Sequence, residues 1–522
     1  MIVSRSMRLP HRPFVSLRVR VLGLTAVALA FAISRAGLSD VANLDGWSSF
    51  SRFWTAVIRP ETATEFLRLT WDAALQTLAF AVLGSSLALL LGAGGGLALS
   101  RRMGGSAWWR SGMSVVAAVP RAVHEILIAL LLVQVFGFDP IVAVLAIGIP
   151  FGAVTAKVFA DAIDDAEPAA FDSLRASGAS RLAAMLYGIG PHVRGELIGY
   201  GFYRLECAIR SAAILGIAGV GGLGFQLDLS FESLRYAEIW TLIAALMLLS
   251  GGADAVSSSV RLGSRRVAPA RLLAGAVLAL GWSAWQVGLE VSSLWSERTR
   301  NRIPTFVDDL FPPRLGPGGW SELGSATLDT VALAVLALVI AVAIGVAGAV
   351  VIRRPTLDQH PGGWLRRSAG RLLLLMFRAV PAPIWAFLFV LILFPGLWPG
   401  AVALGVYNAG VLGRLFAEAI ESQPLDAERS AVLAGAGAVT RWCYGILPQA
   451  APRLISLSVY RGEVIVRETI VIGVVGAGGL GQLVRDHLVA RDFAAVTTVV
   501  IVLVALAVAA DAVGSMLRRS LR

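Results

Sequence analysis

The sequence predicts an all-α polytopic membrane protein of about twelve transmembrane helices, arranged as two parallel six-helix repeats. The first observation is composition: of 522 residues, 57% are apolar and 15% are charged, a balance far from that of soluble globular chains. The second observation is a spacing, because motifs of the first half recur in the second half at one offset of 257 residues. Together they indicate a duplicated membrane domain.

Twelve apolar runs follow one another along the chain, and each holds roughly 20 residues, enough to cross a bilayer as an α-helix. They begin near Val19, Ala73, Val115, Ile141, Leu197, Ile239, Leu272, Leu328, Leu372, Ala401, Leu454 and Phe493. No convincing small-residue cleavage site follows the first run, so we expect an uncleaved first helix.

The net charge of +11 comes from arginines clustered at the ends of the apolar runs, among them Arg5, Arg8 and Arg12. This placement is typical of cytoplasmic loops, so we expect a lipid bilayer and no nucleic acid as partner. Crossing at every run places both termini and the basic junction 261–271 in the cytoplasm. The segments 33–69 and 290–323 then lie outside.

The repeat is visible in motifs that match at the single offset. They are "RAV" at Arg121 and Arg378, "YGIGP" at Tyr187 and "YGILP" at Tyr444, and "YRLECAIR" at Tyr203 and "YRGEVIVR" at Tyr460. We expect a first repeat over residues 1–262, a cytoplasmic linker over 263–271 and a second repeat over 272–522. An even number of crossings gives both repeats one orientation, and such a pair can enclose a path between its halves, as in transporters.

Metal and redox chemistry have no support in the sequence. Cys207 and Cys443 are two lone thiols, and the five histidines are scattered without an H-E-x-x-H pattern. We expect neither a metal site nor a cofactor.

Two glycine-rich stretches, "GVGGLG" and "GAGGLG", have the G-x-G-x-x-G spacing of a dinucleotide-binding turn. That turn needs a strand before it, whereas each stretch here follows a long apolar helix. We therefore expect glycine turns that end membrane helices, where positive φ or close helix packing excludes a side chain. The glycines are Gly219, Gly221, Gly222, Gly224, Gly476, Gly478, Gly479 and Gly481.

A polar stretch of some thirty residues lies between the fourth and fifth runs of each half. In both stretches a glycine, Gly178 or Gly435, precedes a proline, Pro191 or Pro448, by thirteen residues. A break in a short helix, followed by a proline that opens the next membrane helix, predicts a surface helix along the membrane. An ordinary amphipathic connector is the alternative, which the duplicated spacing disfavours.

At these loops the sequence resembles the membrane-spanning subunits of binding-protein-dependent ABC importers: "DSLRASGASRLAAMLYGIGP" is similar to their E-A-A-x-x-x-G loop. More narrowly, "FRAVPAPIWAFLFV", "GRLFAEAIE" and "YRGEVIVRETIVIGVVGAGGLGQ" resemble phosphonate permease subunits. The resemblance covers roughly residues 70–254 and 327–513. Family members are usually separate six-helix chains that pair, whereas two copies are fused here.

The resemblance implies a type I importer permease of the bacterial inner membrane for phosphonate, phosphite or phosphate. It is a transport subunit and not an enzyme, and its single lysine, Lys157, cannot supply a P-loop. The expected partners are a separate ATP-binding subunit in two copies and an extracytoplasmic solute-binding protein. Since the family's loop docks as a coupling helix into the ATP-binding subunit, the candidate coupling residues are Asp172, Ala176, Gly178, Pro191, Glu428, Gly435 and Pro448.

The two halves depart from the family pattern in different ways. Asp172 replaces the usual glutamate of the loop, and Arg429 takes that position in the second half, beside Glu428. His124 stands where the second half has Pro381. Equal function of the two loops is therefore an open question.

Charged residues recur within the fifth apolar run of each half: Arg204, Glu206 and Arg210, then Arg461, Glu463 and Arg467. A charge near the bilayer centre costs at least about 2.5 kcal/mol, so these side chains must face protein or water. One interpretation is pairing within each helix, since the glutamate and the last arginine are four residues apart. The other is that Arg210 and Arg467 line the pathway and favour an anion.

Two rival functions stay open at this stage. Within the class, the chain could be an ABC permease for methionine, an alkanesulfonate, thiamine or iron. Outside it, the chain could be a twelve-helix secondary transporter driven by ions, which the duplicated loops and the scarcity of embedded carboxylates disfavour.

Overall fold

The computed structural model describes residues 14–37, 41–263, 269–353, 363–424 and 426–520. Over these residues the chain forms helices joined by turns and loops, and the β pairing is limited to one isolated bridge between Ala42 and Leu393. The basic residues Arg5, Arg8 and Arg12 and most of the expected linker 263–271 lie outside the described residues.

The α-helices of the first half are α1 (Phe14–Ala36), α2 (Trp47–Thr55), α3 (Thr64–Leu99), α4 (Ala107–Ala122), α5 (Glu125–Phe136), α6 (Pro140–Asp165), α7 (Ala169–Ala176), α8 (Arg181–Ala184), α9 (Gly190–Leu215), α10 (Leu223–Glu232) and α11 (Tyr236–Gly263). Those of the second half are α12 (Pro269–Val287), α13 (Glu297–Leu310), α14 (Gly319–Ile352), α15 (Gly363–Ala379), α16 (Ala382–Val390), α17 (Leu397–Glu421), α18 (Asp426–Leu433), α19 (Ala438–Thr440), α20 (Leu447–Val474), α21 (Gly479–Val489) and α22 (Phe493–Ser520).

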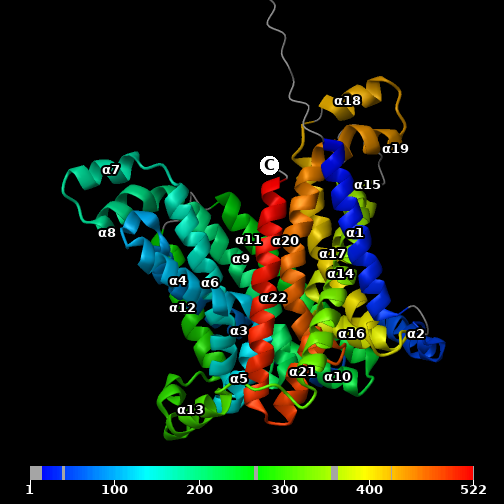
Figure 1. Ribbon diagram of the computed structural model, residues 1–522, viewed down its shortest axis with the longest axis horizontal. Coiled ribbons are helices and arrows are strands. Elements are labelled where there is room, and N and C mark those ends of the chain that lie inside the picture. The colour runs from blue at the N-terminus through cyan, green and yellow to red at the C-terminus, as the bar shows by residue number, and fades with distance from the viewer. Residues whose placement is uncertain (1–13, 38–40, 264–268, 354–362, 425, 521–522) are drawn as a thin grey trace, which may run out of the picture.

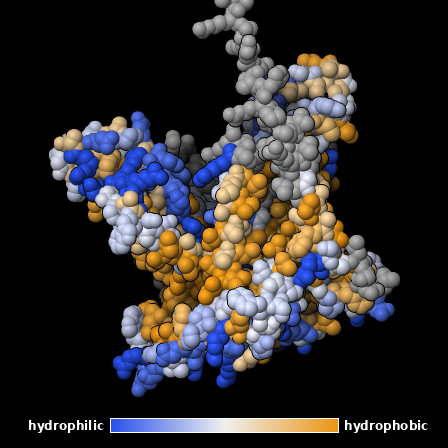
Figure 2. All heavy atoms as spheres, in the orientation of Figure 1, coloured by the Kyte–Doolittle hydropathy of each residue, from blue (hydrophilic) through white to orange (hydrophobic). Residues whose placement is uncertain are grey.

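Among the described residues, six helices are long and apolar enough to cross a membrane alone, α3, α6, α11, α14, α17 and α22, and counting each bent pair as one span gives up to ten. Four pairs pass the same test but are bent, namely α4–α5 by 88°, α9–α10 by 56°, α15–α16 by 93° and α20–α21 by 42°. Shorter apolar stretches lie in α1 and α12. Each apolar run of the sequence therefore falls on one helix or one bent pair, which confirms the all-α polytopic fold. Figure 2 shows the apolar band between two polar ends.

The sharp bends of α4–α5 and α15–α16 fall at equivalent positions of the two repeats and were not expected from the sequence. The first occurs at Val123 and His124, where Val123 is extended with ψ 134°. The second occurs at Val380 and Pro381, and Pro381 precedes the first residue of α16. Proline disfavours helical geometry in the residue before it, which explains the second break.

The first helix of each half packs against the other half. Helix α1 contacts α14, and helix α12 contacts α3. An ion pair of 2.6 Å joins Arg35 of α1 to Asp329 of α14. Buried apolar residues from both halves also share one core, in which Trp240 and Leu223 lie with Trp385 and Leu333. The two repeats are therefore interlocked, and the expected boundary between them in the sequence does not separate two independent domains in the fold.

Figure 1 places the α7–α8 and α18–α19 segments at the same end of the molecule, together with the first described turn of α1 and the end of α22. Helices α2 and α13 lie toward the opposite end. Both halves therefore run in the same direction, as a parallel repeat requires.

The glycine-rich stretches end helices and not strands, as predicted. Residues Gly219, Gly221 and Gly222 all have positive φ between α9 and α10. Gly476 and Gly478 have positive φ between α20 and α21, as does Gly479, the first residue of α21. A threonine hydroxyl on the second span of each half then accepts a hydrogen bond from the start of the short helix, at 2.8 Å in both cases: Thr77 from Leu223, and Thr330 from Leu480.

We predict that Gly224→Ala destabilises the protein. A Cβ at Gly224 would overlap the carbonyl oxygen of Ala213, so α10 must move off α9 at a cost of about 1–3 kcal/mol. The melting temperature of the detergent-purified chain measures this change. Gly252→Ala is the matched control, because a Cβ there meets no atom within 4 Å. Equal melting temperatures for the two variants would contradict the packing assignment.

Candidate functional site

A cavity of about 580 Å³ lies between the two halves. Helices α4, α6 and α9 of the first half and α15, α17, α20 and α22 of the second half contribute its lining. In Figure 2 the surface is hollowed between the lobe formed by α7 and α8 and the helices α20 and α22. The charged residues predicted from the fifth run all line this cavity: Arg204, Glu206, Arg210, Arg461, Glu463 and Arg467.

The lining is rich in charge of both signs. Its cations are Arg121, Lys157, Arg204, Arg210, Arg378, Arg414, Arg461 and Arg467, and its carboxylates are Glu125, Glu206, Glu418, Glu463, Glu468 and Asp511. The cations outnumber the carboxylates by two. A cavity with low-dielectric walls strengthens the field of such charges compared with bulk water.

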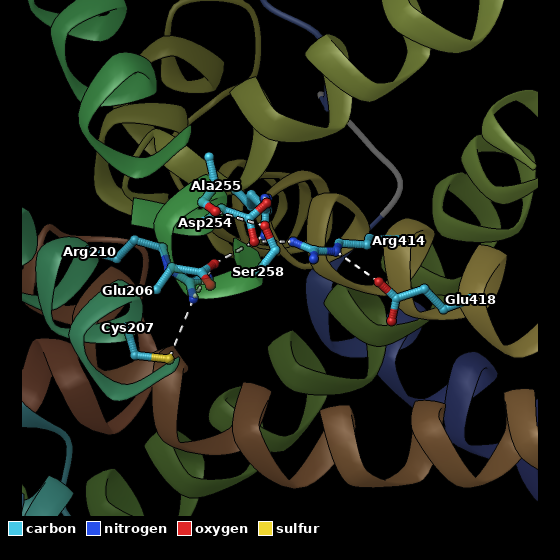
Figure 3. A network of polar contacts seen from close by, with 9 residues as sticks. Glu206, Cys207, Arg210, Asp254, Ala255, Ser258, Arg414 and Glu418 are labelled. Carbon is cyan, nitrogen blue, oxygen red and sulfur yellow. Dashed lines mark hydrogen bonds and ion pairs between the residues drawn. The ribbon is translucent and has the colours of Figure 1, made fainter. Parts of the chain in front are cut away.

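Five residues form an ion-pair network across the halves (Figure 3), which we name the Asp254 network. Arg378 of α15 binds Glu206 of α9 at 3.2 Å and Asp254 of α11 at 3.1 Å. Arg414 of α17 binds Asp254 at 2.7 Å and Glu418 at 3.0 Å. Each arginine therefore holds a carboxylate of the opposite half.

The expected pairing within each helix is found in one half and not in the other. Arg210 lies 3.7 Å from Glu206, a longer distance than the 3.2 Å contact between Glu206 and Arg378. Glu463 instead pairs with Arg518 of α22, and the described residues contain no Glu463–Arg467 ion pair. Arg467 donates to the main-chain oxygen of Arg121 at 2.9 Å.

Three cavity arginines have no carboxylate partner among the described residues. Arg204 donates to the hydroxyl of Tyr200 at 2.7 Å and packs over aromatic rings, including that of Phe151 at 5.0 Å. Arg467 contacts the main-chain oxygen described above, and the side chain of Arg121 makes no ion pair. By contrast, Arg461 is held by Glu468 at 2.9 Å and by the amide oxygen of Asn408.

The bend between α4 and α5 carries polar side chains that its counterpart lacks. Glu125 accepts a hydrogen bond of 2.5 Å from Ser211 and lies 3.3 Å from His124. The equivalent positions of the second half are Pro381 and Ala382. The described residues hold no cluster of His, Cys, Asp and Glu suited to a metal ion.

The candidate coupling loops have the break and the helix start that the sequence predicted. Gly178 and Gly435 have φ of 88° and 73°, and Pro191 and Pro448 lie in the first turns of α9 and α20. Asp172 and Ala176 are exposed.

The two loops differ at their acidic positions but share an exposed aromatic residue. Glu428 is buried and lies 3.7 Å from Arg353, while its neighbour Arg429 is exposed. Tyr187 and Tyr444, which are equivalent in the repeat, are 77% and 80% exposed. Each half therefore presents one exposed tyrosine ring after its loop segment.

Sequence reasoning missed several charged residues at this site, above all Arg121, Arg378 and Arg414 of the cavity lining and Asp254, which binds two of these arginines. The signal was present, because each has an equivalent of the same charge in the other half. Comparing charged residues at the repeat offset, instead of charges within apolar runs, would have found them.

Comparison with known proteins places these features in a family. The family described as binding-protein-dependent transport system inner membrane component matches residues 341–522. The phosphate-import permease protein PhnE of Mycolicibacterium smegmatis is 28% identical over 463 residues, covering 86% of this chain and 85% of that protein. The phosphite transport system permease protein PtxC of Stutzerimonas stutzeri is 32% identical over 243 residues, covering 45% of this chain and 84% of that protein.

The coverage of these two relatives agrees with the repeat. A relative that aligns along most of both chains supports two fused copies, whereas one that aligns with less than half of this chain supports a single copy. The apolar helices add that the protein is a multi-pass inner-membrane protein. The chain belongs to the family of binding-protein-dependent ABC permeases, as a transport subunit with two permease copies in one polypeptide.

Proposed function

We propose that this permease imports a phosphorus oxyanion, such as a phosphonate, phosphite or phosphate, through the cavity between its halves. The observation that carries the proposal is the group of cavity arginines without carboxylate partners, Arg121, Arg204 and Arg467. Guanidinium groups suit phosphorus oxyanions because their planar donors match the oxygen geometry. The printed functions of the relatives, phosphate import and phosphite transport, support the same substrate class.

The energy source in this proposal is a separate ABC ATPase in two copies, one at each loop segment. The exposed rings of Tyr187 and Tyr444 lie at equivalent positions of the two repeats. The α7–α8 and α18–α19 segments that precede them lie at the same end of the molecule, which suits two identical partners. Asp172 is exposed, whereas the second loop presents Arg429. The first loop therefore keeps more of the acidic character of the family motif.

In the same proposal the end with α7 and α18 is cytoplasmic and the end with α2 and α13 is external, where a solute-binding protein delivers the substrate. Residues 1–262 and 272–522 are the two permease units and 263–271 is their linker. Permeases for methionine, an alkanesulfonate, thiamine or iron remain alternatives. The unneutralised arginines favour an oxyanion over a metal cation.

We predict that Arg467→Gln slows uptake of labelled phosphite or phosphonate by about tenfold or more, since removing a charged hydrogen-bond donor from a site costs about 1.5–3 kcal/mol. Arg210→Gln should have a smaller effect, because the charge of Arg210 is already paired with Glu206, a carboxylate that Arg378 also binds. Uptake by cells that express the full transport system, at matched membrane levels, is the measurement.

The double variants separate a pathway role from a structural ion pair. If Arg210 acts only as the partner of Glu206, then Glu206→Gln combined with Arg210→Gln should recover uptake, since no charge is left alone. Glu463→Gln combined with Arg467→Gln should not recover it, because these two side chains are not paired. Recovery in the second double variant would reject the pathway role of Arg467.

We predict that replacing Gly178 or Gly435 by valine uncouples ATP hydrolysis from uptake while the chain stays in the membrane. Both glycines have positive φ with open space around them, so the valine strains the turn without disturbing the interior. ATPase activity and uptake of the reconstituted transporter are the paired measurements. The Gly178 variant should be affected more strongly. Normal coupled transport in both variants would reject the loop assignment.

We predict that single cysteines at Leu433 and Ser321 label from opposite sides of the membrane, in a chain with Cys207 and Cys443 replaced by serine. Leu433 lies in the loop segment and is 89% exposed, and Ser321 lies in the first turn of α14. A membrane-impermeant thiol reagent added to intact spheroplasts should modify the Ser321 position alone. Labelling of both positions from outside would overturn the orientation.

A further inference from the structure

The charges of the Asp254 network recur in the opposite half with the same signs. Glu463 and Asp511 are equivalent to Glu206 and Asp254, and Arg121, Lys157 and Asp161 are equivalent to Arg378, Arg414 and Glu418. We name these five residues the Asp511 set. By the repeat, this set should join α4 and α6 of the first half to α20 and α22 of the second.

The contacts of the Asp511 set between the halves are not formed among the described residues. Lys157 pairs with Asp161 of its own helix at 2.6 Å, as Arg414 pairs with Glu418. Within the part of the chain that the structure describes, the side chains of Arg121 and Asp511 have no ion-pair partner, although both line the cavity with Lys157 and Glu463. One interface between the halves is therefore closed by ion pairs. At its equivalent, α4 touches α22 and the main-chain oxygen of Arg121 binds Arg467, but the charged side chains of Arg121, Lys157, Glu463 and Asp511 line the cavity without an ion pair between the halves among the described residues.

Glu463 shows that the equivalent carboxylates have two kinds of partner. Glu206 is bound across the interface by Arg378, whereas Glu463 is bound by Arg518 of its own half. If Glu463 released Arg518 and bound Arg121 instead, it would make the same contact across the halves that Glu206 makes with Arg378. Such an exchange keeps a carboxylate paired in both arrangements, which avoids an uncompensated buried charge.

Apolar residues beside the two interfaces show matched changes of size. At the closed interface, Gly251 of α11 faces Leu375 of α15, and a Cβ at Gly251 would lie 3.4 Å from the leucine. The equivalent residues are Val508 and Ala118, which both line the cavity. In the first pair the large side chain is on α15, and in the second it is on α22, the equivalent of α11. Each pair therefore combines one small and one large side chain. Volume-conserving pairs of this kind preserve the fit of a packed interface.

We propose that the Asp511 set closes the cavity in another state of the transport cycle, when the cavity-lining turns of α4 and α6 move closer to α20 and α22 than the present α4–α22 contact allows. Arg121 then binds Glu463 and Asp511, Lys157 binds Asp511, and Ala118 packs against Val508. The open charges attract one another across a cavity with low-dielectric walls, and an approaching ATPase pair at the loops supplies the displacement. This inference rests on the proposed transport function and adds the residues that gate it.

A pair of cysteines tests the closure directly. Ala118→Cys combined with Val508→Cys, in a chain without Cys207 and Cys443, should cross-link under oxidation in membranes that hold the full transporter with ATP and phosphite. The cross-link should be weak without ATP. Gly251→Cys combined with Leu375→Cys is the matched control, which should cross-link in both conditions because that interface is already closed.

Charge substitutions test whether the Asp511 set drives the closure. Asp511→Lys places the new lysine opposite Lys157 and should lower the cross-linked fraction by up to about fivefold, the upper end of the effect of an exposed ion pair. Adding Lys157→Asp to that chain should restore the cross-link, since the charges are exchanged and not removed. Gly251–Leu375 cross-linking should not change in either chain.

The outcomes separate this inference from the transport proposal. An absent or ATP-independent cross-link at positions 118 and 508, with normal phosphite uptake in the same cells, would reject the closure and leave transport standing. An unchanged cross-link after Asp511→Lys would reject the role of the charges. No phosphite or phosphonate uptake by the parent chain would count against the transport proposal itself.

Discussion

Charged side chains within membrane helices are the constraint on which the rest of this structure depends. Each costs at least about 2.5 kcal/mol near the bilayer centre unless it finds a partner or water, so the helices that carry them must meet each other and not lipid. Arg378 meets this requirement with carboxylates on two helices of the opposite half, Glu206 and Asp254. The ion pairs therefore determine where the halves touch, and the remaining charges line the cavity beside them.

The interlocked packing explains how a charged cavity can exist without separating the halves. Helices α1 and α12 each reach across to the other half, and one apolar core includes both Trp240 of the first half and Trp385 of the second. Burial of such large side chains supplies the cohesion. The polar interface is then free to change its partners, since it does not have to hold the molecule together.

Much of the fold followed from the sequence because membrane helices obey simple rules of length and apolarity. Each apolar run corresponds to one helix or one bent pair of helices. Gly219 and Gly476 end helices, as the apolar helix before each glycine-rich stretch predicted. The bends at His124 and Pro381 were missed, because one apolar run cannot reveal where a helix stops and restarts. Arg378 as a second partner of Glu206 and Arg518 as the partner of Glu463 were also missed, since helix spacing describes neighbours four residues away and says nothing of other helices.

Fusion of the two copies gives each half the freedom to change alone, which two identical chains in a symmetric pair would not have. Ser211 contacts Glu125 in the first half, whereas its equivalent, Glu468, neutralises Arg461 in the second. Because only the second half has a carboxylate at this position, Arg461 has an acidic partner and its equivalent, Arg204, has none among the described residues. The unneutralised arginines Arg121 and Arg204 thus belong to the first half and Arg467 to the second, so an anion among them would contact both halves. Movement of the halves would then change its surroundings, which is the coupling that an importer requires.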